Sequence, residues 1–419
     1  MLTTLPRFLV SMLRLHSCQR GSAASQSSGR RRRLRRGALL AGALLAHCAG
    51  VSCAGTPNSW STVALSDSGA CPGKLVFSGT AASKGLVYVF GGKPDGLNSN
   101  VDSTNWLTEI DPATGVCTRL DDNAEPPVKG NPPSKRWAMG LSALDGVLWV
   151  FGGYDGSSNH QDLHAFTIAT RTWRKVVAAD APSARGYMGF SAGAGGLLVT
   201  YGKNGGNPRD AHFFDVATEK WQALPSPPAA GGLVQANDRY GHGQAMLNGT
   251  AFVFGGFSAV KGQYLDDLLT LNLGDPDAQW VAVNAQGDVP GGQYAGALVA
   301  VGQQLLYYGG YDDSVGYSSD VTMFDPSTDQ WTEVTGFMGT TPAARASFGG
   351  AAVIGCSVFI YGGEILSDTS DELIRYEADE AVTSCPCPLQ CKQIVADTHT
   401  IDYETNTTVY VRLHHPYEV

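Results

Sequence analysis

The feature that most constrains the fold of this chain is an apolar run ending on glycines, which recurs six times. "VLWVFGG" ends at Gly153, and the other copies lie at steps of roughly fifty to sixty residues. Such a period predicts an array of similar units, so we interpret the glycines as architecture and not as phosphate loops. These glycines are Gly91, Gly92, Gly152, Gly153, Gly202, Gly255, Gly256, Gly309, Gly310, Gly362 and Gly363.

The fifth unit shows the parts of the repeat most clearly. "AGALVAV", "LLYYGG", "DVTMFD" and "WTEV" are typical of four strands joined by turns. The second strand is apolar at successive positions, so both of its faces must be covered, as in sheets stacked face to face. In the third copy, "LLVTYGK", we take Gly202 as the first glycine and Lys203 as the replacement of the second. With 52 Gly and only 16% charged residues, the chain is predicted to be all-β.

An indole recurs where the fourth strand begins. There it is expected to pack between adjacent sheets, because a tryptophan buries a large apolar area. The first unit carries Cys117 at this place. The tryptophans with this predicted role are Trp60, Trp173, Trp221, Trp280 and Trp331.

Taken together, these motifs resemble the Kelch family. The resemblance covers about residues 58–378 and rests on the glycine pair, a later Asp, an apolar residue four positions further, and the late Trp. It implies a β-propeller, whose four-stranded blades surround a central channel. The Asp residues and their apolar followers are Asp162 and Phe166, Asp210 and Phe214, Asp267 and Leu271, and Asp320 and Phe324.

The sequence also indicates how the ring closes. The sixth unit lacks a late Trp strand, whereas "NSWSTVALS" stands alone before the first unit, and its Trp60 and Val63 resemble "WTEV". Residues 58–65 are therefore expected to supply the outer strand of the last blade. We predict a six-bladed Kelch propeller over residues 55–378, acting as a monomer.

The two ends of the chain differ from the repeat. Residues 1–54 hold nine Arg and no acidic residue, and "RRRRLRR" is followed by "GALLAGALLAHCAGV". Ser52 and Ala54 have the small-residue spacing of a signal peptidase site, so we expect a secretory signal peptide cleaved after Ala54. The alternatives are an uncleaved membrane anchor and targeting to an organelle lumen. Residues 379–419 form a Cys-rich tail, interpreted as the start of another module or a truncated end.

Charge limits the partners. The chain carries a net charge of −9, and because the leader is basic, the remainder is strongly acidic. Such a surface repels nucleic acid and anionic membranes, so we expect no nucleic-acid partner and membrane contact only through an anchor.

Outside the leader, the cysteines form an even set, and six cysteines allow fifteen pairings. The tail "CPCPLQCKQ" does not have convincing zinc spacing, so disulfides in an oxidising compartment are favoured over a metal site. Cys71 and Cys117 both belong near the first blade, which makes their pairing one guess among these. The disulfide candidates are Cys71, Cys117, Cys356, Cys385, Cys387 and Cys391, and the glycosylation candidates are Asn248 and Asn406.

Sixteen or seventeen residues before each glycine pair stands a mostly cationic set, which we place at the start of the innermost strand. In Kelch adaptor proteins this position faces one mouth of the channel and holds acidic peptides, so the resemblance implies a site for carboxylates or sulfates. The alternative is that each Arg ties neighbouring blades through carbonyls and carboxylates. The set is Lys74, Arg136, Arg185, Arg239, Gln293 and Arg345, with His242 as a further candidate for the site.

No nucleophile and base pair, P-loop or dinucleotide fingerprint is found, and no metal or cofactor is expected. The predicted function is a non-catalytic scaffold in the secretory pathway or outside the cell, which binds a protein or an acidic glycan. One alternative is a carbohydrate-active propeller enzyme, resembling galactose oxidase or a sugar mutarotase. A cytosolic-type Kelch adaptor is the other, if the leader is not a targeting signal.

Overall fold

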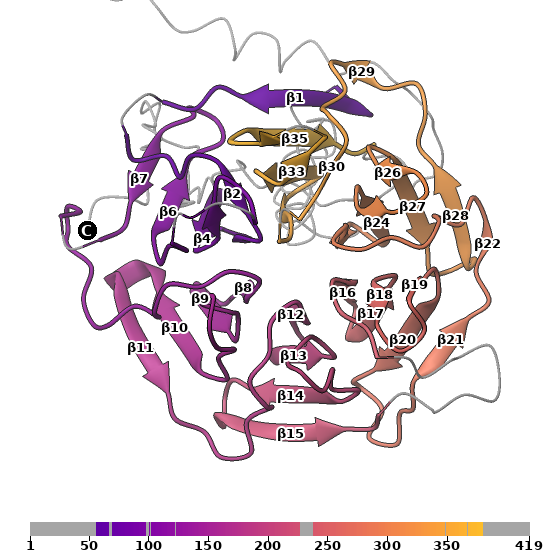
Figure 1. The fold of residues 1–419 in the computed structure, drawn as a ribbon, viewed down its shortest axis with the longest axis horizontal. Coiled ribbons are helices and arrows are strands. Elements are labelled where there is room, and N and C mark those ends of the chain that lie inside the picture. The colour runs from indigo at the N-terminus through magenta and orange to yellow at the C-terminus, as the bar shows by residue number, and fades with distance from the viewer. Residues whose placement is uncertain are drawn as a thin grey trace, which may run out of the picture. The chain divides into compact units, whose positions relative to one another are not determined.

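A computed structural model describes residues 56–379, except 67–68, 98–99, 101, 122, 227–237, 348 and 367. The predicted leader and most of the predicted tail, with Cys385, Cys387, Cys391 and Asn406, lie outside the described residues. Within them, six sheets of four or five strands follow one another around an axis, which confirms the predicted six-bladed all-β propeller (Figure 1). No helix of the described residues is long and apolar enough to cross a membrane.

Each blade has an antiparallel core in which the chain runs from the innermost strand outward, and the fifth and sixth blades gain further outer strands from elsewhere in the chain (Figure 1). The first blade contains β3 (Gly79–Ser83), β4 (Leu86–Phe90), β6 (Leu107–Ile110) and β7 (Cys117–Arg119). The second contains β8 (Gly140–Leu144), β9 (Val147–Phe151), β10 (Leu163–Thr167) and β11 (Thr172–Val176), with the short 3₁₀ helix η1 (Ile168–Thr170) between the last two. The third contains β12 (Gly189–Gly193), β13 (Gly196–Thr200), β14 (Ala211–Asp215) and β15 (Lys220–Leu224).

The remaining blades follow the same order. The fourth contains β16 (Gly243–Leu247), β17 (Thr250–Phe254), β20 (Leu268–Asn272) and β21 (Val281–Val283). The fifth contains β23 (Ala297–Val301), β24 (Gln304–Tyr308), β27 (Val321–Asp325) and β28 (Gln330–Glu333), edged by β22 (Gln286–Gly287). The sixth contains β31 (Ala352–Ile354), β32 (Ser357–Tyr361) and β35 (Leu373–Glu377).

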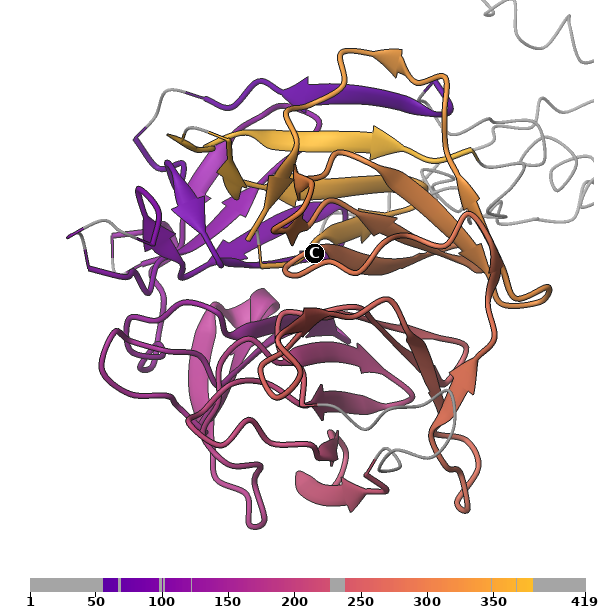
Figure 2. The ribbon, with the colours of Figure 1, turned by 45° about the vertical axis from the view of Figure 1, so that its right-hand side comes forward.

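The sixth blade is completed by β1 (Ser59–Val63), which pairs with β35 over five residues and confirms the predicted closure. On its other side β1 pairs in parallel with β29 (Met338–Gly339), so it lies inside the sheet and not at its edge. Figure 2 shows β1 beside β35 at the rim of the ring. The first described strand of the chain therefore joins the last blade, and the ring is closed by backbone hydrogen bonds.

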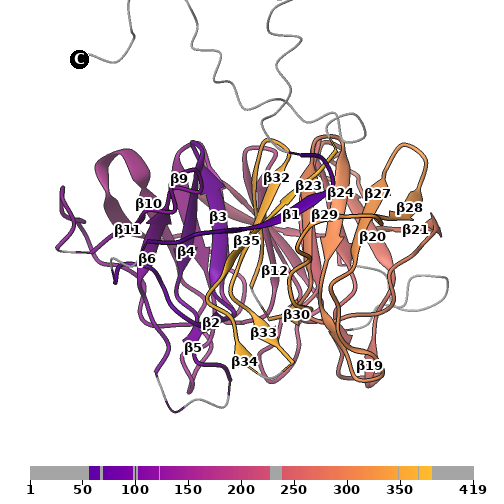
Figure 3. The ribbon, with the colours of Figure 1, turned by 90° about the horizontal axis from the view of Figure 1, so that it is seen from above.

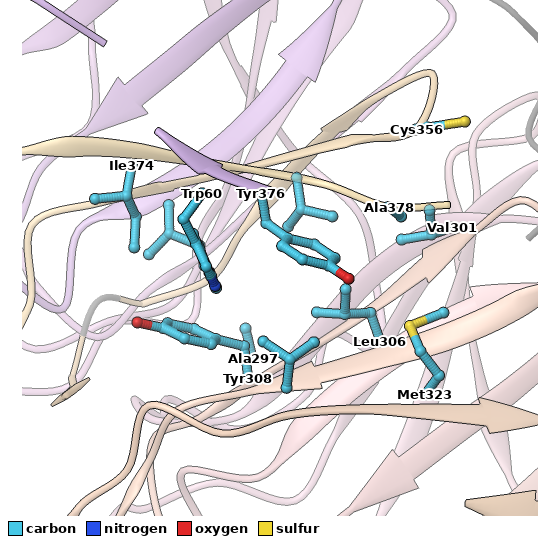
Figure 4. Close-up of a cluster of buried hydrophobic side chains, with 13 residues drawn as sticks. Trp60, Ala297, Val301, Leu306, Tyr308, Met323, Cys356, Ile374, Tyr376 and Ala378 are labelled. Carbon is cyan, nitrogen blue, oxygen red and sulfur yellow. The ribbon is translucent and has the colours of Figure 1, made fainter. Parts of the chain in front are cut away.

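Tryptophans join the blades, as predicted. The Trp173 ring lies 5.6 Å from Phe90 of the first blade, and the Trp331 ring lies 5.0 Å from Phe254 of the fourth blade. Trp60 repeats this contact at the closure, with its ring 5.0 Å from Tyr308 of the fifth blade (Figure 4). Each indole thus packs on the end of the second strand of the preceding blade. Trp221 follows the same rule, and Trp280 is buried directly before β21.

A second set of short strands lies below the blades. Figure 3 shows these hairpins at one edge of the ring, opposite the turns that join the first and second strands. We call this end the hairpin face. Its strands are β2 (Leu75–Val76) with β5 (Lys93–Pro94), β18 (Phe257–Ser258) with β19 (Gln263–Tyr264), β25 (Tyr311–Asp312) with β26 (Gly316–Tyr317), and β30 (Arg345–Ala346) with β33 (Glu364–Ile365) and β34 (Asp368–Thr369).

Candidate functional site

The predicted arginine ring is buried and holds the blades together. Arg136, Arg185, Arg239 and Arg345 are fully inaccessible to solvent. Arg136 donates to the carbonyl of Gly152 at 2.9 Å and to both carboxylate oxygens of Asp162, on the third strand side of the same blade. The arginine backbone serves the neighbouring blade, since the N–H of Gly92 donates to the carbonyl of Arg136. The side chain thus ties strands within one blade, and the link to the neighbouring blade is made by the backbone carbonyl, so the predicted alternative of a side-chain tie between blades is wrong. Carboxylate or sulfate binding by the arginines stays a prediction.

Two carboxylates paired with these arginines, Asp162 and Asp210, are strongly acidic. Burial raises the pKa of Asp162, but hydrogen bonds from His164 and Arg136 outweigh it and hold that pKa well below its usual range. The same balance applies to Asp210 with His212 and Arg185. At neutral pH each pair is therefore a charged, hydrogen-bonded link.

We call the ring position the place in each blade whose backbone carbonyl accepts the N–H of the second glycine of the preceding blade. In the first blade, the residue at this position differs from the predicted one. Leu75 occupies it, because the carbonyl of Leu75 accepts the N–H of Gly363, as the arginine carbonyls do in other blades. Lys74 is exposed and pairs with Asp368. Gln293 does occupy the ring position of the fifth blade, since its carbonyl accepts the N–H of Gly256. The ring residues also lie before the innermost strands and not within them. Leu75 and Arg345 lie in short strands of the hairpin face, β2 and β30.

The third glycine pair also needs correction. Gly202 is the second member and not the first, since its N–H donates to the carbonyl of Arg239, and Tyr201 stands in the first position with a φ of 50°. Lys203 follows the pair and replaces neither glycine. The buried Tyr201 ring lies 5.2 Å from the Arg239 guanidinium and 5.4 Å from the His242 ring.

His242 lies between the third and fourth blades. Its Nε2 is 2.9 Å from the hydroxyl oxygen of Thr200. Burial and the nearby Arg239 charge hold the pKa of His242 well below its usual range, so the ring is neutral at physiological pH. The structure places it in the wall of the channel, and a role in ligand binding stays a prediction.

One end of the channel narrows to a closed ring of backbone hydrogen bonds. Each member lies two residues after a ring position, has a positive φ and donates its N–H to the carbonyl of its neighbour in the preceding blade, over distances of 2.5 to 3.1 Å. The ring closes because the N–H of Phe77 donates to Ser347 of the sixth blade. Its members are Phe77, Ala138, Tyr187, Gly241, Ala295 and Ser347.

Two large side chains fill the middle of this hydrogen-bonded ring. Phe77 is buried, and its ring meets that of Tyr187 edge-on at 5.0 Å. Behind them lies the channel, with a cavity volume of about 330 Å³ and a wall built mainly from Ala, Gly and Ser residues. No Asp, Glu, Lys or Arg side chain lines the described part of this channel, whereas the surface outside the ring is rich in aromatic side chains.

That outer surface is the aromatic face, which the sequence analysis missed. Nine partly exposed aromatic side chains surround the channel end and stack on one another in edge and tilted contacts. They are Trp137, Tyr154, Tyr187, Tyr240, Phe257, Tyr264, Tyr294, Tyr311 and Tyr317. Several directly follow a glycine pair or a ring position, and this recurrence is the signal that was available in the sequence.

Within the aromatic face, the residue after each glycine pair faces the residue after each ring position. In three blades both partners are aromatic, as in the bridge between Tyr294 and Tyr311. In the third blade Lys203 faces Gly186, and in the sixth Glu364 faces Ala346. A charged side chain thus has a small neighbour in two blades that lie opposite each other in the ring of six.

The hairpins beside the aromatic face carry exposed aliphatic side chains at or near their tips. Val260, Val315 and Leu366 have exposed fractions of 70%, 75% and 90%, and Leu97 after β5 is also exposed. These four come from the fourth, fifth, sixth and first blades. The loops of the second and third blades carry polar residues instead, as in "DGSS" and "NGGN". One side of the face is therefore apolar and the other is polar.

The first blade has Leu75 at the ring position in place of an arginine, but it contains a disulfide. A disulfide joins Cys71 to Cys117 across 46 residues of sequence, which confirms that predicted pairing. Cys356 is buried in the core of the last blade. Asn248 is exposed in the turn between β16 and β17, and its glycosylation stays a prediction. Among residues that the structure describes, no group of three His, Cys, Asp or Glu side chains is placed to hold a metal ion.

Comparison with known proteins agrees with this geometry. The KLHDC2/KLHL20/DRC7 Kelch-repeats domain matches residues 55–233 and 229–363. A protein of Thlaspi arvense named N-(sulfonatooxy)prop-2-enimidothioate sulfolyase is 28% identical over 302 residues, which cover 66% of this chain and 80% of that protein. Kelch domain-containing protein 3 of Bos taurus is 28% identical over 162 residues, covering 37% of this chain and 40% of that protein.

Leucine-zipper-like transcriptional regulator 1 of Homo sapiens is 27% identical over 295 residues, covering 67% of this chain and 33% of that protein. This chain thus spans less than half of the length of the last two relatives. The matched residues cover the first five blades and the sixth up to Gly363, and the ring geometry agrees with this match. The chain therefore belongs to the Kelch-repeat family.

Proposed function

We propose that this Kelch-repeat protein is a non-catalytic scaffold that binds a peptide segment of a partner protein on its aromatic face. The observation that carries the proposal is the gathering of nine partly exposed aromatic side chains around the channel end. Tyr and Trp are enriched among the residues that dominate protein interfaces, because they supply a large contact area at low entropic cost. The exposed aliphatic tips extend this area on one side.

Peptide binding is favoured over binding in the channel. The channel end is filled by Phe77 and Tyr187 within a closed backbone ring, so an incoming chain meets the aromatic face first. Lys203 adds a cation there, with its ammonium 4.8 Å from the Tyr240 ring centre. An acidic glycan remains the alternative partner predicted from the sequence.

We also propose that the protein works in an oxidising compartment. The disulfide between Cys71 and Cys117 supports this, because such bonds persist mainly in secreted proteins and in the lumen of the secretory pathway. Peptide mapping of the mature amino terminus, together with fractionation of tagged cells, tests the location. A reduced Cys71 in the native protein and a cytosolic fraction would overturn this proposal.

Selection from a library of random dodecapeptides displayed on phage, with the full chain as bait, tests peptide binding. The substitutions Tyr154→Ser, Phe257→Ser and Tyr311→Ser, made together, remove exposed aromatic area without touching the backbone ring. We expect the recovered peptides to lose at least about tenfold in affinity for this variant.

Trp106→Ser is the matched control, since Trp106 is exposed and stacks on Arg119 of the outermost strand of the first blade. Equal binding to the wild type and the triple variant would overturn the proposed site. Binding of an acidic-glycan array, with no peptide recovered, would support the alternative partner.

A further inference from the structure

Glu364 is the one acidic side chain that directly follows a glycine pair. It is partly buried, and none of the ion pairs among the described residues involves it. Its Oε2 accepts a hydrogen bond from the Ser347 hydroxyl at 3.1 Å. In contrast, the ring carboxylates Asp162, Asp210 and Asp267 each pair with an arginine. Glu364 is thus a fixed negative charge whose cationic partner is missing from the described residues.

Aromatic side chains lie near this carboxylate, since Tyr187 and Tyr317 pack against a buried cluster that contains Ala346, the cross-strand neighbour of Glu364. Burial raises the pKa of Tyr317, and the nearby Glu364 charge raises it further. Burial and Glu364 act in the same way on Tyr187. Burial likewise raises the pKa of Glu364 itself, although hydrogen bonds from Ser347 and from the Leu97 backbone oppose the rise. The tyrosines, on the fifth and third blades, therefore lie within electrostatic reach of a desolvated carboxylate.

The same face already shows how it accommodates a cation. The Lys203 ammonium lies 4.8 Å from the Tyr240 ring centre and 5.8 Å from the Tyr187 ring centre. Tyr187 thus lies near the protein's own cation, Lys203, and its pKa is also raised by the Glu364 charge. A cation over an aromatic ring gains electrostatic energy, and it gains more where a carboxylate completes the site and water is partly excluded.

The residue that faces Glu364 across the strand pair is small. It is Ala346, where the equivalent positions of the fourth and fifth blades carry Tyr240 and Tyr294. The exposed tip residues Leu366 and Val315 lie on the adjacent hairpins of the sixth and fifth blades. A cationic residue that enters here would be flanked by apolar contacts.

We propose that Glu364, with Tyr187 and Tyr317, receives a lysine or arginine side chain of the bound peptide, flanked by apolar residues that contact Leu366 and Val315. This inference rests on the proposed function, because it assigns a side-chain class to the peptide that the aromatic face binds. The charge complementarity is specific, since an unpaired, partly buried carboxylate favours a cation over any neutral side chain.

The test uses the full chain and the peptides recovered from the random dodecapeptide library. We expect the recovered peptides to share a lysine or arginine next to apolar residues. Their affinity should fall by about tenfold or more on Glu364→Gln, which keeps the side-chain shape and the acceptor for Ser347, and further on Glu364→Lys. Replacing the shared cation of the peptide by Gln should cause the same loss on the wild type and little further loss on Glu364→Gln.

Two control variants accompany these measurements. Lys203→Gln removes the opposite charge from the equivalent position and should leave the preference for a cationic peptide intact. Asp277→Asn removes an exposed carboxylate in the turn before β21, at the other end of the blade, and should change nothing. Unchanged melting temperatures show that all variants fold.

The outcomes separate this inference from the proposed function. Peptides that lose binding on the aromatic triple variant, but lack a shared cation or bind Glu364→Gln as well as the wild type, overturn the cation site alone. Peptides that bind the aromatic triple variant normally, or a library that yields none, overturn the proposed function and the cation site together.

Discussion

Replacement of Trp60 tests the closure of the ring, because this indole links the first described strand to the last two blades. Trp60 is 3% exposed, and its ring lies 5.0 Å from both Tyr308 and Tyr376, as Figure 4 illustrates. Its ring also lies 6.4 Å from Phe337. Truncation of a buried tryptophan to alanine leaves a cavity and costs about 3–5 kcal/mol. Trp60→Ala should therefore weaken the sixth blade and with it the whole ring.

This free-energy loss converts to a measurable change in melting temperature. For a domain of roughly 320 residues, with an unfolding entropy of about 2 cal/mol/K per residue, a loss of 4 kcal/mol lowers the melting temperature by about 6 °C. Scanning calorimetry of the full chain measures this value, with Trp106→Ala as the control. Trp106 is 45% exposed, and its loss should cost less than about 1 kcal/mol.

The refuting result is equally clear. A melting temperature of Trp60→Ala within about 1 °C of the wild type, as expected for a surface change, would show that β1 contributes nothing to the ring. Removal of residues 55–66 should then also leave the melting temperature unchanged. If Trp60→Ala is destabilised while Trp106→Ala is not, the closure by β1 is supported.

Three further predictions concern the ties between and within blades. Reduction of the disulfide, or Cys71→Ser with Cys117→Ser, should lower stability by about 4 kcal/mol, since the bond closes a loop of 46 residues; an unchanged thermal transition under reductant would contradict this. The pKa of Asp162 lies below its unfolded value of about 3.9, so the ionised carboxylate stabilises the fold above that pH, and this contribution is lost as the pH falls further. Asp162→Asn should therefore lower the free energy of unfolding at pH 7. It should also flatten the fall of this free energy below about pH 5, as measured by denaturant titration. Gly241→Ala should lower the melting temperature more than Gly205→Ala. Both glycines have a φ near 60°, but a Cβ on Gly241 would lie 2.1 Å from the Tyr294 ring, whereas nothing lies within 4 Å of a Cβ on Gly205. Equal melting temperatures would argue against the close packing of the hydrogen-bonded ring.

Much of the fold was predictable because the same strand pattern occurs in six successive repeats. A second strand that is apolar at every position requires cover on both faces, and stacked blades provide that cover. The closure was predictable from Trp60, because its segment has the pattern of a fourth strand but precedes the first repeat, while the sixth repeat lacks a fourth strand. The structure places this Trp on Tyr308 in the same way that it places Trp331 on Phe254.

The register errors have one cause. Glycine was taken as the marker of the strand end, but a tyrosine at φ 50° can hold the first position, as Tyr201 does. The spacing was the better guide: sixteen residues separate Arg136 from Gly152, and the same step leads from Arg185 to Tyr201. Applied to Gly91, this step gives Leu75 and not Lys74, although the sixth blade has a step of seventeen residues from Arg345 to Gly362.

The aromatic face could not be assembled from the sequence in the same way. Tyr187 and Tyr294 are far apart in the chain, and their rings lie 6.3 Å apart only because the hydrogen-bonded ring draws the blades together at one end. The cation site depends on the same convergence, since Glu364 and Tyr317 come from different blades. Side chains of different blades meet here because the ring is closed, and the order of residues along the sequence indicates this closure only indirectly.

Hydrogen exchange of the backbone amides, measured with and without bound peptide, tests most directly whether peptides bind on the aromatic face. With a peptide from the library bound, we expect slower exchange in segments of the hairpin face that directly follow the glycine pairs, around residues 93–97, 203–207, 257–264, 311–317 and 364–366. The turns at the opposite end, around residues 84–85, 145–146 and 248–249, should exchange at unchanged rates. Protection of those turns, with no change on the hairpin face, would contradict the proposed binding site.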